Sequence, residues 1–146
     1  MMFKTTYVDL GGPTPNLSLV INGVETKEEY VAFPAFIKTG RYDERVKRIG
    51  FLEVKKKDTR SDYERWQDEY YHAYYPTPTI IEIEVKVPTC VKKIFIPNTI
   101  EAISKQAFKN LKDVTFEIDE KNYRYAMKDG KIVDKHSGEV IWPYEE

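Results

Sequence analysis

The residue types that most often carry out nucleophilic or metal chemistry are scarce in this chain. Cys90 is its only cysteine, and His72 and His136 are its only histidines. A thiol beside a histidine can carry out acyl transfer, and a zinc site needs several Cys or His ligands at regular spacing. Cys90 instead lies at a turn that enters a predicted strand, a usual place for a small, half-buried side chain. We therefore expect a structural cysteine, no metal site and no cofactor.

Glu82 and Glu84 are the best candidates for a catalytic carboxylate pair. On one face of a strand they would lie about 6–7 Å apart, which is close to the spacing of some glycosidase pairs. Their alternation with apolar residues and with Lys86 is more typical of a solvated strand face. The sequence holds no Gly-rich phosphate loop, nucleophile elbow or His-x-x-x-His motif. We expect no catalytic residues and no enzymatic activity.

The segment 61–75, SDYERWQDEYYHAYY, is rich in aromatic residues. Tyrosine and tryptophan are favoured at recognition surfaces because they offer a large contact area at low entropic cost. A helical aromatic stripe is usually part of a core, so packing of all these rings on a sheet is the alternative. The predicted partner-binding residues are Trp66, Tyr70, Tyr71, Tyr74 and Tyr75.

Charge is segregated along the middle of the chain. Residues 38–60 contain nine Lys or Arg and four Asp or Glu, a net charge of +5. Residues 61–84 contain one Arg and six acids, a net charge of −5. The two blocks are expected to pair with each other, or else KKKDTR (55–60) forms a small basic patch for an acidic partner or RNA. Because the whole chain has a formal net charge of −1, nucleic-acid binding is not expected.

A helix over 61–75 is the clearest predicted element. Ser61 and Glu64 form a capping box, and Pro76 and Pro78 end the helix. The strand that follows, TIIEIEVKVP, alternates strictly. Its predicted buried face consists of Ile81, Ile83, Val85 and Val87.

Turn residues divide the rest of the chain into short strands. An entry strand and a loop are predicted over 1–16, a hairpin turn at Asn22-Gly23, and a strand over 46–57. Residues 26–40 are ambiguous, since Thr26 and Glu29 suit a helix start that Pro34 would soon stop. The tail reads as a pair of hairpins with turns at Asp129-Gly130 and Ser137-Gly138.

An apolar pattern occurs twice between residues 91 and 119. Val91, Ile94 and Ile96 carry the first copy, and the second follows 20 residues later at Leu111, Val114 and Phe116. A period of about 20 is at the short end of the range for leucine-rich repeats. Each such unit is a strand with a return segment, and it gains stability by stacking on a neighbour.

From Ile80 onward, the sequence resembles the bacterial surface-antigen (BspA-like) leucine-rich repeats. The residues that carry this resemblance are IFIPNTIEAISKQAF, with the Ala107-Phe108 pair, and the terminal NYRYAMKDGKIVDKHSGEVIWPY. The resemblance implies a strand ladder that binds a ligand or partner, often outside the cell. Residues 1–79 are expected to cap this short array, and residues 80–146 to form the repeat region of one cooperative domain.

We thus predict an α+β, β-rich fold: a short leucine-rich-repeat-like ladder, capped by an N-terminal sheet with one helix. The expected function is non-catalytic recognition of another protein, through strand faces or the Tyr-rich helix; the alternative is carbohydrate binding by exposed Tyr and Trp of the 63–75 helix. An unpaired sheet edge favours a homo-oligomer. With no signal peptide or membrane span in the sequence, a soluble cytoplasmic protein is expected, or a cell-surface or secreted one if a leader is removed.

Overall fold

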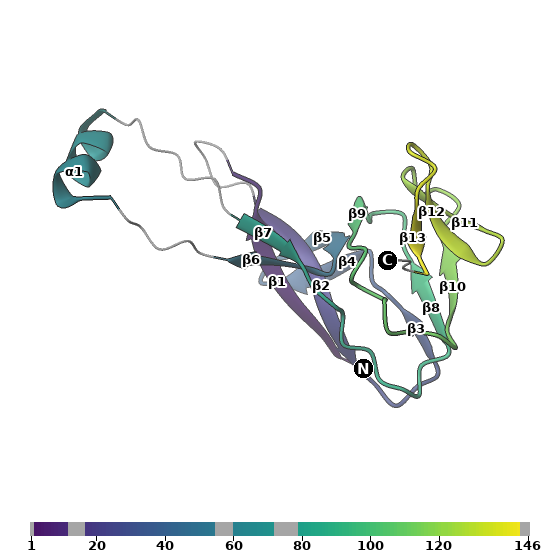
Figure 1. Ribbon diagram of the computed structural model, residues 1–146. Helices are drawn as coiled ribbons and strands as arrows, with labels where there is room; N and C mark the ends of the chain where they lie inside the picture. The colour runs from purple at the N-terminus through teal and green to yellow at the C-terminus, as the bar shows by residue number, and fades with distance from the viewer. Residues whose placement is uncertain (1, 12–16, 55–59, 72–78, 144–146) are drawn as a thin grey trace.

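The computed structural model describes residues 2–11, 17–54, 60–71 and 79–143, and in these ranges the chain is β-rich with one α-helix. The predicted entry strand is confirmed as β1, and it pairs with β2 in an antiparallel ladder (Figure 1). The largest sheet has the order β1-β2-β5-β4, with β9 also paired to β5. Its strands are β1 (Met2–Asp9), β2 (Leu17–Glu25), β4 (Phe36–Thr39), β5 (Tyr42–Ile49) and β9 (Ala102–Ile103).

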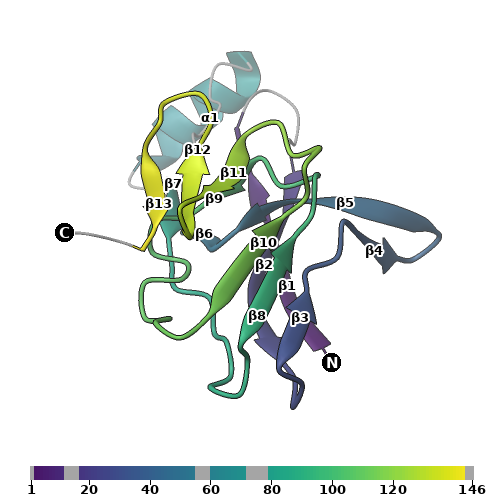
Figure 2. The same ribbon diagram turned by 90° about the vertical axis from the view of Figure 1, so that its right-hand side faces the viewer.

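A second sheet is wholly parallel and has the order β10-β8-β3 (Figure 2). Its strands are β3 (Tyr30–Ala32), β8 (Lys93–Ile96) and β10 (Thr115–Ile118). Ile94 of β8 lies opposite Phe116 of β10, an offset of 116 − 94 = 22 residues. The predicted 20-residue offset is therefore wrong by two, because Val114 lies before β10 in the connection and Phe116 is the residue that enters the core.

Strands of the largest sheet also form parallel pairs. β2 pairs with β5, and β5 pairs with β9, both in parallel. At a third position, the backbone bridges from Gly23 to Lys86, and the amide of Val85 donates to the carbonyl of Ala107 at 2.9 Å. Two of these pairings, β5 with β9 and Gly23 with Lys86, join residues from the two sides of the predicted boundary at 79/80. That boundary itself stays a prediction.

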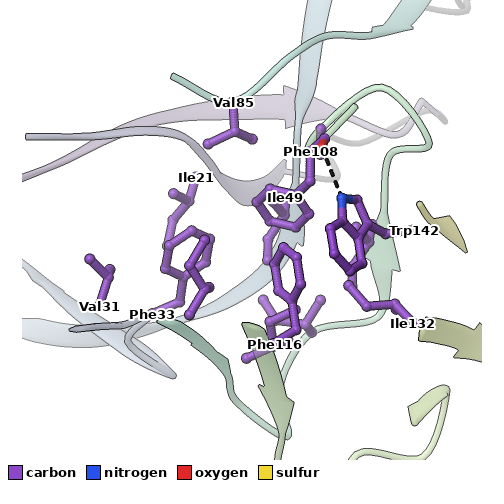
Figure 3. Close-up of a cluster of buried hydrophobic side chains, with 14 of the residues drawn as sticks. Ile21, Val31, Phe33, Ile49, Val85, Phe108, Phe116, Ile132 and Trp142 are labelled. Atoms are coloured by element: carbon purple, nitrogen blue, oxygen red, sulfur yellow. Dashed lines mark hydrogen bonds between the residues drawn. The ribbon is translucent and has the colours of Figure 1, made fainter. Parts of the chain in front are cut away.

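The core lies between these sheets and is crossed by a series of aromatic rings (Figure 3). Phe33 and Phe108 lie 6.2 Å apart between centroids, Phe108 and Phe116 lie 4.8 Å apart, and Phe116 and Trp142 lie 4.7 Å apart. The indole Nε1 of Trp142 donates to the carbonyl of Phe108 at 3.1 Å, so its one polar group is satisfied inside the core. One apolar cluster therefore joins strands from the N-terminal and C-terminal halves.

The tail forms an antiparallel sheet of β11 (Tyr125–Lys128), β12 (Lys131–Asp134) and β13 (Val140–Trp142). Both predicted turns are confirmed. Asp129 and Gly130 have positive φ and connect β11 to β12 as a two-residue loop, while Gly138 has positive φ between β12 and β13. The residues at both turns tolerate the positive φ that these turns require.

Other predicted elements are wrong. Asn22-Gly23 lies inside β2 and is no turn: Gly23 sits opposite Lys4, and the Asn22 amide exchanges two hydrogen bonds with the backbone of Phe51. Residues 26–40, which the sequence leaves ambiguous, contain β3 and β4. The Thr26 hydroxyl does accept a hydrogen bond, from the amide of Glu28, but it closes a turn.

The strand predicted over 46–57 breaks at Gly50, whose φ is +84°. β5 ends before this residue and β6 (Phe51–Val54) begins after it. β6 pairs in an antiparallel ladder with β7 (Thr79–Glu82), and between them the chain forms the helix α1 (Asp62–Tyr71). We call residues 51–82 the arm. Figure 1 shows α1 apart from the sheets, beyond the β6–β7 ribbon.

Candidate partner-binding surface

The helix α1 has a locally encoded start. The Ser61 hydroxyl accepts a hydrogen bond from the amide of Glu64 at 3.2 Å, which confirms the predicted cap. Two ion pairs hold its polar side: Arg60 with Asp68 at 3.0 Å, and Arg65 with Asp62 at 2.5 Å. The Arg65–Asp62 pair is exposed, and such pairs contribute only about 0.2–1 kcal/mol; the Arg60–Asp68 pair is half-buried. The helix is therefore formed by local interactions and owes little to packing.

No side chain of α1 is buried, although the helix carries four aromatic residues. Trp66 is 58% exposed and Tyr70 is 66% exposed. The expectation that the whole stripe packs on a sheet is thus wrong for these rings. Burial of aromatic rings of this size is a dominant source of stability in cores and interfaces. The rings of α1 remain exposed, so they do not contribute this stabilisation within the chain.

The rings of α1 contact one another. Trp66 stacks on Tyr70 with centroids 5.6 Å apart and planes 21° apart. Tyr63 lies 6.1 Å from Trp66, and Tyr71 meets Tyr70 edge-on at 5.0 Å. The Tyr63–Trp66 and Trp66–Tyr70 contacts are i, i+3 and i, i+4 pairs, which stabilise a helix, whereas Tyr70 and Tyr71 are adjacent in the sequence. The result is a continuous aromatic strip, and we call these four residues the α1 aromatic strip.

The structure describes three of the five predicted binding residues. Trp66, Tyr70 and Tyr71 lie together on α1. Tyr74 and Tyr75 lie outside the described residues. The predicted binding set omits Tyr63, although its ring extends the strip and its position three residues before Trp66 indicates the same side of the helix.

The ribbon that supports α1 also exposes apolar side chains. Leu52 lies opposite Ile81 in the β6–β7 ladder, and Val54 is on the same face of β6. All three are exposed, so the prediction that Ile81 faces the core is wrong. Strict alternation indicates that a strand has two different faces. It does not tell which neighbour covers the apolar one, and Val85 alone of that predicted face is fully buried.

The outer face of the parallel sheet is the other predicted recognition surface. Lys93 forms an ion pair with Glu117 at 3.1 Å, and its ammonium lies 5.8 Å from the ring centroid of Tyr30. The neighbouring row contains Ala32, Phe95 and Glu117. This face is small, and its charges are already paired within the chain. It offers less unused apolar area than the α1 aromatic strip.

The candidate catalytic groups have structural partners. The Cys90 thiol lies 3.6 Å from the carbonyl oxygen of Thr26 and packs beside the core. Glu82 accepts a hydrogen bond from the amide of Lys105, and Glu84 accepts one from the Asn110 side chain. His136 lies in the turn before β13, and His72 lies outside the described residues. These groups are dispersed over the fold.

Perturbed pKa values also mark structural positions. Burial raises the pKa of Tyr125, and the hydrogen bond that its hydroxyl accepts from the Ile103 amide at 2.8 Å acts in the opposite direction. Burial alone would raise the pKa of Asp134, but hydrogen bonds from the amides of His136 and Ser137 and the charge of Arg124 lower it on balance. Both groups hold the C-terminal sheet in place.

Within the described part of the chain, no three Asp, Glu, His or Cys side chains group as metal ligands would. No helix in those same ranges is both long and apolar enough to cross a membrane.

Comparison with known proteins returns no match, whether with family models, with curated proteins or with solved structures.

Proposed function

We propose that this protein is a non-catalytic recognition module that binds another protein through the α1 aromatic strip. One observation carries the proposal: a capped helix presents four aromatic residues and buries none of its side chains. Hot spots of protein interfaces are enriched in tryptophan and tyrosine, which gain most of their contact energy when a partner covers them. The mutual stacking of the rings lowers the entropy lost on binding.

The arrangement of the arm supports the same proposal. The β6–β7 ribbon exposes Leu52, Val54 and Ile81 on one face, and α1, which lies beyond the ribbon (Figure 1), has ion-paired polar residues besides its aromatic ones. Exposed apolar groups that gather in one part of a molecule mark interaction sites more often than scattered ones do. In the proposal, α1 supplies the anchoring contacts and the ribbon face adds apolar area around them.

We assign the parallel passes of the body to a short ladder like that of the surface-antigen leucine-rich repeats. The support is the resemblance from Ile80 onward, together with the in-register parallel pairing of β8 and β10. In this proposal the ladder is a scaffold, and α1 is the functional addition to it. In this proposal the protein needs no cofactor and does not bind nucleic acid.

A cross-linking pull-down tests the proposal. The wild type is compared with Trp66→Ala/Tyr70→Ala, and Tyr123→Ala serves as the control, because Tyr123 is an exposed aromatic residue of the C-terminal region. One protein that is captured by the wild type and by the control, but lost with the double variant, is the expected result. Equal capture by all three baits would contradict a role for α1.

Carbohydrate binding is the second candidate, favoured by the near-parallel rings of Trp66 and Tyr70. Sugars stack on such exposed faces. The chain has two tryptophans, Trp66 on α1 and the buried Trp142. Oligosaccharide binding at the strip would quench the emission of Trp66 and leave that of Trp142 unchanged, and an unchanged spectrum across a glycan panel would remove this candidate.

A further inference from the structure

The β4–β5 hairpin is a second exposed surface, and it is basic where α1 is acidic. The hairpin of β4 and β5 exposes two large aromatic residues, with Phe36 52% and Tyr42 77% exposed. Between residues 36 and 47 the sequence has four basic residues and two acids, a net charge of +2. The hairpin is thus an aromatic and basic surface. The basic residues are Lys38, Arg41, Arg45 and Lys47. Arg48 turns toward the body, where its guanidinium lies 5.8 Å from the ring centroid of Phe51.

The helix α1 is its electrostatic counterpart. Between Asp62 and Tyr71 the sequence has four acids and one arginine, a net charge of −3. Glu64 and Glu69 are exposed on α1, as Lys38 and Arg41 are on the hairpin. Opposite charges of this kind steer two surfaces together and set their register. Aromatic residues on both sides supply the area that is buried.

Within the hairpin, a basic side chain already lies over an aromatic ring. The guanidinium of Arg45 lies 5.9 Å from the centroid of Phe36, as in a cation–π pair. The same chemistry is available to the rings of the α1 aromatic strip, whose neighbours are carboxylates. Within one chain the two surfaces do not meet: Figures 1 and 2 both show α1 and β4 in separate parts of the molecule.

We propose that α1 of one copy docks on the β4–β5 hairpin of a second copy, so that the chain forms a homodimer. This inference rests on the proposed function, because it uses the same helix. Each copy carries both surfaces, and a two-fold arrangement therefore makes the contact twice. A chain with a net charge of −1 also meets little overall repulsion on self-association.

A charge-swap experiment tests this contact in the full chain. The first variant, Lys38→Glu/Arg41→Glu, makes the hairpin acidic like α1, and the second, Glu64→Lys/Glu69→Lys, makes α1 basic like the hairpin. In either variant alone, both contacts of a two-fold dimer are repulsive. When the two variants are mixed, both contacts of the mixed dimer are attractive again. Circular dichroism of each variant checks that it is folded.

The mass is measured by sedimentation velocity over a concentration series at low and high salt. We expect a wild-type dimer that weakens with salt, a dimer affinity lower by about tenfold or more in each variant, and recovery in the equimolar mixture. A monomeric wild type, variants that dimerise like the wild type, or a mixture that stays monomeric would each overturn the inference. A monomer that still captures another protein through α1 would leave the proposed function intact.

Discussion

The amide of Ile83 donates a hydrogen bond to the carbonyl of Gly50 at 2.9 Å, which closes the base of the arm. The chain leaves the body after Gly50 and returns at Ile83 beside the point of departure. Gly50 itself donates to the carbonyl of Ile21 at 3.1 Å, so the junction is bonded into the body. Phe51 and Glu82, next to this junction, still bond to the body through Asn22 and Lys105, whereas no side chain of α1 is buried.

Removal of the outer arm is therefore expected to leave the body folded. In the test variant, an Asn-Gly turn replaces residues 55–78 and connects Val54 to Thr79, which are paired in the ribbon. Because no side chain of α1 is buried, we expect cooperative thermal unfolding with a midpoint within a few degrees of the wild type. Loss of the folded spectrum would show that the body depends on the arm.

Substitution of Gly50 should be far more damaging than loss of the helix. Its φ is +84°, and an added Cβ would lie 2.8 Å from the Cβ of Ala107 and 2.9 Å from the carbonyl oxygen of Ile83. Gly50→Ala is expected to lower the free energy of unfolding by about 3 kcal/mol or more. Gly40→Ala is the matched control: its φ is +64°, but nothing lies within 4 Å of the added Cβ.

The control should cost only the backbone term, about 1–2 kcal/mol. Urea denaturation of both variants compares the two costs on one scale. Equal destabilisation would mean that the crowded junction at Ala107 and Ile83 adds nothing to the conformational penalty.

Asn122 is expected to be the most sensitive polar residue of the body. It is fully buried, its amide donates to the carbonyls of Pro97 and Ile100, and its oxygen accepts from the amides of Arg124 and Tyr125. Asn122→Ala leaves these buried groups unpaired and should cost about 3 kcal/mol or more.

The exposed Asn98 provides the control for that substitution, and Asn98→Ala should stay within about 0.5 kcal/mol of the wild type. Chemical denaturation of the two variants gives the comparison. A cost for Asn122→Ala as small as that of the control would contradict the bonding described for this side chain.

Stability should fall at alkaline pH because of Tyr125. Burial raises the pKa of its hydroxyl above the unfolded value, so the folded state favours the neutral hydroxyl over the ionised one. The contribution is complete below the unfolded pKa of about 10 and is lost as the pH rises through the folded pKa. Tyr125→Phe should be less stable at neutral pH and should show a smaller loss between neutral and alkaline conditions. An identical alkaline loss in both proteins would assign it to other groups.

Local signals predicted part of this fold, and long-range pairing explains what they missed. The Ser61 cap and the Asp129-Gly130 turn follow from residues next to one another in the chain. Asn22-Gly23 has the composition of a turn, but its strand is held by Lys4 on one side and Phe51 on the other. Neither neighbour can be identified from the sequence around Asn22.

The same reasoning applies to the binding surface. The aromatic stripe of α1 was visible in the sequence, and its spacing gave Trp66 and Tyr70 a common side. Whether that side is buried depends on where the arm projects, which the helix pattern does not encode. Ile81 shows the converse: its alternation suggested a core position, and the position of β7 in the arm leaves it exposed.

The most direct test of the account is the capture experiment with α1 altered and the fold preserved. Wild type, Trp66→Ala/Tyr70→Ala and the Tyr123→Ala control are used as cross-linking baits at equal concentration, after matched unfolding midpoints have been verified. The account predicts that one protein, another chain or a further copy of this one, is retained by the wild type and the control and reduced about tenfold or more by the double variant. Undiminished capture by the double variant would contradict the claim that α1 is the recognition surface.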